Sequence, residues 1–74
     1  MMAINPLRLG DTGDMVKAMQ LALIVNGYTV GAGGATGTFD DTTLRALESF
    51  QGDAGVPVQP SCDNASWSAL GPSK

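Results

Sequence analysis

A helical phrase occurs twice in this chain, and it limits the folds that 74 residues can adopt. The first copy covers residues 16–20, VKAMQ, and the second covers residues 44–51, LRALESFQ. In each copy the apolar residues stand three or four positions apart, which places them on one face of an α-helix. A turn that contains glycine or aspartate precedes each copy. The pattern therefore predicts two helices that share one small core.

Cap and stop signals bound these two helices. We expect the first to run from about Asp14 to Asn26, because the Asn-Gly pair at its end accepts the left-handed conformation of a helix C-terminus. Asp40 or Asp41 caps the second helix, which ends near residues 52–55. The first helix is predicted to carry two adjoining apolar stripes, namely Val16, Met19, Leu23 and Leu21, Ile24, Val25, Tyr28. The core face of the second is predicted to hold Thr43, Leu44, Leu47, Phe50 and Gln51.

The rest of the chain is expected to form a strap, a hairpin and a third helix. Residues 1–9 are predicted to form an extended lead-in whose Leu7 and Leu9 face the core. Residues 28–30 and 36–39 are predicted to pair as a small hairpin around a glycine-rich tip. Asp63 is expected to cap a brief third helix that stops before the Gly-Pro pair at residues 71–72, leaving 71–74 as a tail.

The expected fold class is therefore mainly α. We predict a small three-helix bundle with a short irregular β-hairpin between the first and second helices. Residues 1–74 are expected to form one single domain, because area scaling leaves a chain of this length only one modest core.

Charge and hydropathy exclude two classes of partner. The formal net charge is −3, and the four basic residues are scattered along the chain as Arg8, Lys17, Arg45 and Lys74. A nucleic-acid interface needs clustered positive charge, so we expect no nucleic acid as a partner. We also expect no membrane binding, because no apolar run approaches the roughly 20 residues that span a bilayer. The N-terminus lacks the basic and apolar regions of a secretory signal peptide.

Residues that could support catalysis or metal binding are scarce. The chain has no histidine and a single cysteine, Cys62, so we expect neither a metal site nor another cofactor. Asp40 and Asp41 are adjacent carboxylates, but a glycosidase needs two carboxyl groups that face each other across the scissile bond. A helix N-cap explains this pair better. The serines lack a base, and Cys62 is predicted to be buried and inert. We therefore expect no catalytic residues and no enzyme activity.

The order of several short motifs resembles the three-helix peptidoglycan-binding domain that is appended to bacterial and bacteriophage cell-wall hydrolases. The first half of the match comprises LRLG at 7–10, the pattern of Gly13, Val16 and Gln20, and NGY at 26–28. The second half comprises GTF at 37–39, FQ at 50–51, GVPV at 55–58 and DNASWSAL at 63–70. The chain departs from the family pattern at Thr36, at Asp40 and at Ser66, which stand where relatives carry an acid, a glycine and a threonine.

The resemblance implies a non-catalytic module that anchors or targets a wall-acting protein to peptidoglycan, through either the glycan strand or the stem peptide. The place of action would be the bacterial cell wall or periplasm, and a phage-encoded protein could act there. The alternative is a protein-protein interaction or virion-structural module that reuses the fold. The matrix metalloproteinase propeptide shares this fold and inhibits zinc with a cysteine. That role does not fit here, because Cys62 precedes the third helix.

Seven residues are the predicted ligand contacts. Tyr28, Phe39 and Trp67 offer aromatic faces, although Trp67 is also a candidate core anchor. The loop from Gly37 to Asp40 is expected to present polar tips and free backbone groups to a neutral, amide-rich ligand. The predicted set is Tyr28, Gly37, Thr38, Phe39, Asp40, Gln51 and Trp67.

Overall fold

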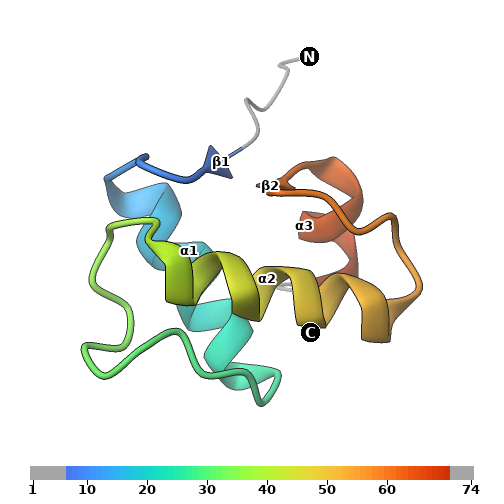
Figure 1. The fold of residues 1–74 in the computed structure, drawn as a ribbon, viewed down its shortest axis with the longest axis horizontal. Coiled ribbons are helices and arrows are strands. Elements are labelled where there is room, and N and C mark those ends of the chain that lie inside the picture. The colour runs from blue at the N-terminus through green and yellow to red at the C-terminus, as the bar shows by residue number, and fades with distance from the viewer. Residues whose placement is uncertain (1–6, 71–74) are drawn as a thin grey trace.

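Three helices and a two-stranded antiparallel sheet make up the fold in the computed structural model, which describes residues 7–70. The elements follow the order β1 (Leu7–Arg8), α1 (Asp14–Val25), α2 (Asp41–Ala54), β2 (Ser61–Cys62) and α3 (Asn64–Leu70). Helix α2 crosses the middle of the view in Figure 1, and α1 contacts both α2 and α3. The three predicted helices are confirmed. The predicted lead-in before Leu7 and the predicted tail at 71–74 lie outside the described residues.

Helix α1 buries only one of its two predicted apolar stripes. Val16, Met19 and Leu23 are fully buried. Three residues of the second stripe lie outside the core, because Leu21, Ile24 and Val25 are 50%, 42% and 85% exposed, whereas its fourth residue, Tyr28, packs against the core. Only the first of the two predicted stripes is therefore a core face. One helix in a three-helix domain meets its neighbours over a limited arc, so α1 keeps an apolar outer face that faces solvent.

Helix α2 begins and ends as its sequence predicts. The carboxylate of Asp40 accepts a hydrogen bond from the Thr43 backbone N–H at 3.0 Å, which makes Asp40 the N-cap. The helix ends at Gly55, whose φ of 79° is the left-handed conformation that glycine adopts without steric cost. Four residues of the predicted core face are confirmed as buried, namely Thr43, Leu47, Phe50 and Gln51. The fifth, Leu44, is partly buried and packs against the core.

The predicted hairpin between α1 and α2 does not form. Instead β1 pairs with β2, in a register that places Leu7 opposite Cys62 and Arg8 opposite Ser61. Residues 28–30 have no strand partner, and Thr38 forms only an isolated bridge with Thr12. The glycines between the two predicted strands interrupt an extended backbone, because Gly31, Gly34 and Gly37 all adopt positive φ. Leu9 also departs from the prediction, because it is 52% exposed.

The core lies where the three helices and the sheet meet. Phe39 and Val30 enter it from the connection between α1 and α2, and Cys62 enters it from β2. Burial raises the pKa of the Cys62 thiol to about 12, so the thiolate is scarce at neutral pH and the predicted inert, buried cysteine is confirmed as buried. The buried apolar set is Val16, Met19, Leu23, Val30, Phe39, Ala46, Leu47, Phe50, Cys62 and Leu70.

The buried Gln20 side chain ties α1 to the start of α2. Its Nε2 donates to the backbone carbonyl of Thr38 and to the Thr43 hydroxyl, both at 2.9 Å. Its Oε1 accepts from the backbone N–H of Gly37 at 2.8 Å. The amide group therefore supplies hydrogen-bond partners to polar groups that are shielded from water and would otherwise have none.

Gln51 repeats this arrangement one helix later. Its Nε2 donates to the Ser61 carbonyl at 3.0 Å and to the Ser66 hydroxyl at 2.9 Å, and its Oε1 accepts from the Gln59 backbone N–H at 3.0 Å. Ser66 also donates its backbone N–H to Asp63, which caps α3 as predicted. The helical phrase repeated in the sequence is thus a repeated structural unit, in which a buried glutamine on one helix binds a hydroxyl in the first turn of the next.

Truncation of the α2 core face should remove much of the stability. We expect Leu47→Ala to lower the free energy of unfolding by about 2 to 5 kcal/mol, because it leaves a cavity in a single small core. The matched control is Leu21→Ala, in which the leucine is 50% exposed and on the outer face of α1. Urea denaturation measures both variants, and equal midpoints for the two would contradict the assignment of the α2 core face.

Loss of a buried glutamine should cost more than loss of an exposed one. Gln20→Leu is expected to lower the free energy of unfolding by at least about 2 kcal/mol, because it leaves several buried polar groups without a partner. In Gln59 the side chain is half-buried and donates only to Asp63, so Gln59→Leu should cost about 1 kcal/mol or less. Chemical denaturation compares them. A Gln20→Leu variant as stable as Gln59→Leu would refute the structural role of the amide.

Candidate functional site

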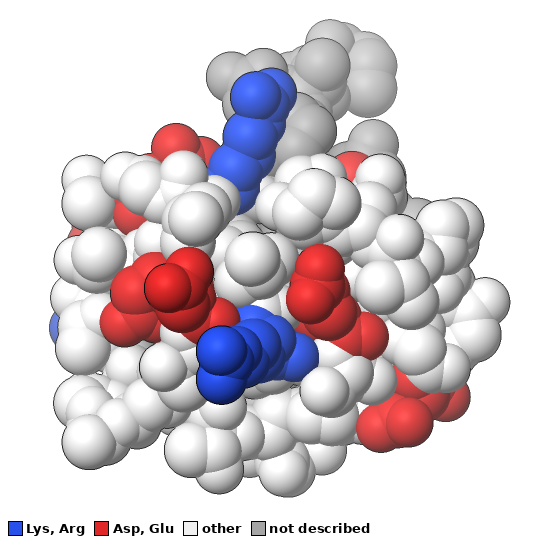
Figure 2. All heavy atoms as spheres, viewed as in Figure 1, with Lys and Arg blue, Asp and Glu red and all other residues white. Residues whose placement is uncertain are grey.

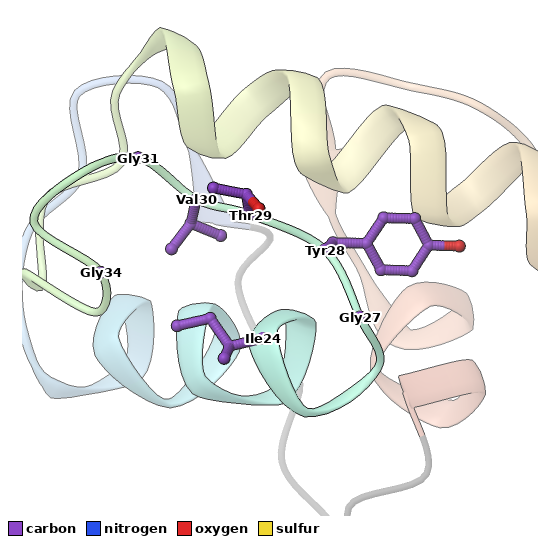
Figure 3. A pocket seen from close by; sticks show the side chains of 7 residues that line it. All are labelled: Ile24, Gly27, Tyr28, Thr29, Val30, Gly31 and Gly34. Carbon is purple, nitrogen blue, oxygen red and sulfur yellow. The ribbon is translucent and has the colours of Figure 1, made fainter.

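A groove of about 370 Å³ opens where α1 ends, and Figure 3 shows the side chains that line it. Helix α1 ends at Val25 with Asn26 as its C-cap, and two further bonds close the turn: the Gly27 N–H donates to the carbonyl of Ile24, and the Tyr28 N–H donates to the carbonyl of Leu23. The chain then runs between α1 and α2 and turns back at a bond from the Gly34 N–H to the Gly31 carbonyl. The lining residues are Ile24, Gly27, Tyr28, Thr29, Val30, Gly31 and Gly34.

Tyr28 is held at one end of this groove. Its ring lies edge-to-face with Phe50, with the centroids 5.7 Å apart, and its hydroxyl donates to Oδ2 of Asp53 at 2.5 Å. The hydrogen bond to the Asp53 carboxylate, together with that negative charge, raises the pKa of the Tyr28 phenol above its ordinary value. The tyrosine therefore stays protonated and fixed in place, and it acts as a wall of the groove.

The loop from Gly37 to Asp40 does not offer the free backbone groups that its sequence suggests. The Gly37 N–H and the Thr38 carbonyl bind Gln20, and the Gly37 carbonyl accepts from Gly13. The remaining groups of residues 38–39 pair with Thr36, Asp11 and Gly10. The loop is therefore a closed clasp between α1 and α2, and it does not line the groove.

Asp40 is exposed, and its capping role accounts for its chemistry. The backbone N–H of Thr43 and then its hydroxyl bind the carboxylate, which lowers the pKa of Asp40. This carboxylate stabilises the start of α2 as its N-cap.

Two predicted contacts are inside the protein. Phe39 is 1% exposed and Gln51 is 0% exposed, and all three hydrogen bonds of Gln51 go to protein groups. Phe39 and Gln51 are therefore structural residues in this fold, because neither side chain can reach a ligand without partial unfolding. Of the seven predicted contacts, the structure places only Tyr28 in the groove.

Trp67 packs against the core as a half-buried side chain, which agrees with its alternative role as a core anchor. A buried tryptophan ring usually donates its N–H to a hydrogen-bond partner. Nε1 is instead buried without a hydrogen-bond partner among residues 7–70. The residue is not part of the groove lining.

The described part of the surface offers few groups that could bind a charged ligand or a metal ion. Figure 2 shows acidic and basic groups scattered among uncharged surface, with no clustered basic patch on the face in view. Residues 7–70 contain no group of three metal-ligating side chains, and none of the helices described is long and apolar enough to cross a membrane. The groove is a concave feature of the described surface that combines apolar and backbone polar groups.

Sequence reasoning missed most of the groove lining. Ile24 was predicted only as part of an apolar stripe on the first helix, and Thr29 and Val30 were predicted to form a hairpin strand. The available signal was the helix stop at Gly27 followed by further glycines at 31 and 34. Such a run favours an irregular connection whose backbone is accessible to a ligand.

Comparisons with known proteins agree on one family. The family described as "Putative peptidoglycan binding domain" matches residues 12–70. An N-acetylmuramoyl-L-alanine amidase, CwlL of Bacillus licheniformis, is 36% identical over 52 residues, which are 70% of this chain and 14% of the amidase. The chain thus spans a small part of that relative.

Solved structures give the same result for the fold. The SleB N-terminal domain matches with a TM-score of 0.84 at 27% identity, over 95% of this chain and 93% of that domain. A peptidoglycan-binding protein from Clostridioides difficile matches at 0.83 with 34% identity, over 90% of this chain and 40% of the other. A Burkholderia AP3 phage endolysin matches at 0.82 with 27% identity, over 95% of this chain and 26% of the endolysin.

The hydrogen bond at the end of the groove can be tested by titration. The chain has one tyrosine, so phenolate absorbance reports on Tyr28 alone. Because Asp53 raises the pKa of Tyr28, we expect Asp53→Ala to lower that pKa towards its ordinary value. Asp41→Ala, at the other end of α2, should leave it unchanged. An unchanged Tyr28 pKa in Asp53→Ala would contradict the contact.

Proposed function

Because this chain belongs to the peptidoglycan-binding domain family, we propose that it is a non-catalytic module that binds peptidoglycan and holds a wall-acting protein at its substrate. The observation that carries the proposal is the groove at the end of α1. It is concave and uncharged, and it joins apolar side chains to accessible backbone groups, as small-ligand sites commonly do. The place of action is the bacterial cell wall, whether the protein is bacterial or phage-encoded.

Tethering explains how a small module of this kind is useful. The amidase and the endolysin are much longer than the part that this chain matches, so a linked catalytic domain is the expected companion. Binding to the polymer keeps such a domain at a high effective concentration of substrate, on the order of millimolar for a short flexible linker. Weak binding by the module is then sufficient.

The uncharged groove also bears on the part of the wall that is recognised. The domain has a net charge of −3 and only four basic residues, so it gains nothing from attraction to anionic wall polymers. The affinity must then come from short-range contacts with peptidoglycan itself. Binding should therefore depend little on moderate salt and should persist after teichoic acids are stripped.

One observation favours the alternative role as a protein-contact module. The outer face of α1 carries Leu21, Ile24 and Val25, all exposed, and no charged residue lies between them. Exposed apolar patches of this kind mark interaction surfaces in many proteins. Of these three residues only Ile24 lines the groove. Substitutions at Leu21 and Val25 would therefore affect a protein contact on this face but not ligand binding in the groove.

Cosedimentation with purified sacculi tests the proposal. We expect Ile24→Ser to weaken binding about tenfold, because it removes an apolar wall of the groove without disturbing the core. Val58→Ser is the matched control, since Val58 is a 58% exposed apolar residue outside the groove. The control should bind as the parent does.

Two results would contradict the proposal. Failure of the parent domain to cosediment with sacculi of any common chemotype would reject wall binding and favour the protein-contact role. Release of soluble muropeptides by the domain alone would show that it has catalytic activity.

A further inference from the structure

From Tyr28 to Gly31 the backbone leaves a row of polar groups without a partner among residues 7–70. The unpaired groups are the carbonyl of Tyr28, the N–H and carbonyl of both Thr29 and Val30, and the N–H of Gly31. By contrast, every N–H and carbonyl of residues 37–39 is paired within the protein. Two segments of one connection thus differ sharply, and the unpaired one lines the groove.

The accessible part of this row is one edge of the segment. Thr29 is exposed and Gly31 is half-buried, whereas Val30 is 3% exposed. In an extended chain the N–H and carbonyl groups of alternate residues share one edge. The Thr29 N–H, the Thr29 carbonyl and the Gly31 N–H therefore form the edge that a ligand can reach. The Gly31 carbonyl is already taken by Gly34.

The side chains around this edge suit a peptide better than a sugar. A sugar ring needs several polar side chains for its hydroxyl groups or a free aromatic face. The lining has no amide, carboxylate or basic side chain, and its one aromatic residue, Tyr28, is already engaged with Phe50 and Asp53. Ile24 and Val30 lie close together beside the groove (Figure 3), and because Val30 is buried, the exposed Ile24 side chain supplies most of the apolar wall. An extended peptide uses both the backbone edge and this wall.

A carboxylate next to the Tyr28 end of the groove adds a second requirement, although Asp53 does not itself line the groove. Asp53 accepts the Tyr28 hydroxyl through Oδ2, and its Oδ1 accepts no hydrogen bond from residues 7–70. No basic side chain lines the groove, and the domain carries a net charge of −3. This end therefore complements a cationic amine and disfavours a second carboxylate.

We propose that the groove binds an extended peptide with a free amine, which adds as a strand to the Thr29–Gly31 edge and places its amine beside Asp53. This inference rests on the proposed function and specifies it: the part of peptidoglycan that is recognised is the stem peptide and not the glycan strand. The backbone bonds supply affinity for any extended peptide, and Asp53 supplies preference for the amine.

Two fractions from one amidase digest of sacculi test this assignment, namely the released stem peptides and the peptide-free glycan strands. In a titration of the isotope-labelled domain, the peptide fraction should shift the amide signals of Thr29, Val30 and Gly31 and slow hydrogen exchange at Thr29 and Gly31. The glycan fraction should shift none of them. Binding of both fractions with equal affinity, or binding of sacculi but of neither fraction, would overturn the inference while leaving wall binding intact. No binding even to sacculi would reject the proposed function itself.

Variants test the two contacts separately. Thr29→Pro removes a backbone N–H that Thr29→Ala keeps, so we expect the proline variant to bind the peptide fraction at least about tenfold more weakly than the alanine variant. Equal affinity of these two variants, both shown to be folded by their amide spectra, would overturn strand addition.

Asp53→Asn should bind amine-acetylated and unmodified peptides equally, whereas Asp41→Asn should keep the parent's preference for the free amine. A preference retained in Asp53→Asn would overturn the role of Asp53.

Discussion

Two buried glutamine amides hold the connections of this domain in place. Gln20 and Gln51 are both fully buried, and each makes two hydrogen bonds to the segment that leads into the next helix and one to a hydroxyl in the first turn of that helix. A buried amide that found fewer partners would cost free energy, so these hydrogen bonds favour the observed path of each connection. Residues 7–70 contain no metal cluster and no disulfide, and these amides take over the fixing role that such links have in many small domains.

The same interaction explains where a ligand can bind. Gln20 reaches Gly37 and Thr38 but not the first half of the connection, so residues 28–31 keep unpaired backbone groups. The glycines that end α1 and turn the chain back leave this half beside an apolar wall instead of inside the core. The fold thus separates a closed clasp from an open groove within one connection, and it is this groove that we propose as the peptidoglycan site.

Local signals predicted the helices, and contacts distant in sequence decided the rest. Caps such as Asp40 and stops such as Gly55 act within a few residues, so their effects are visible in the sequence. The hairpin was wrong because Thr38 pairs with Thr12 and Gln20, which no local pattern indicates. Gln51 was predicted both on the core face of the second helix and as a ligand contact, and only the three-dimensional structure reveals the buried partners that occupy its amide. The proposed edge at Thr29 became visible only once those pairings were known.

Native-state hydrogen exchange measured residue by residue tests the central claim most directly, because it reports on the clasp and the groove together. If the glutamines fix the connections, the loop amides of Gly37 and Gln59 should exchange about as slowly as amides in the middle of α2, since both require extensive unfolding to open. The amide of Thr29, which has no partner among residues 7–70, should exchange almost as fast as in an unfolded chain when no ligand is present. Fast exchange at Gly37 and Gln59, or strong protection at Thr29 in the free domain, would contradict this account.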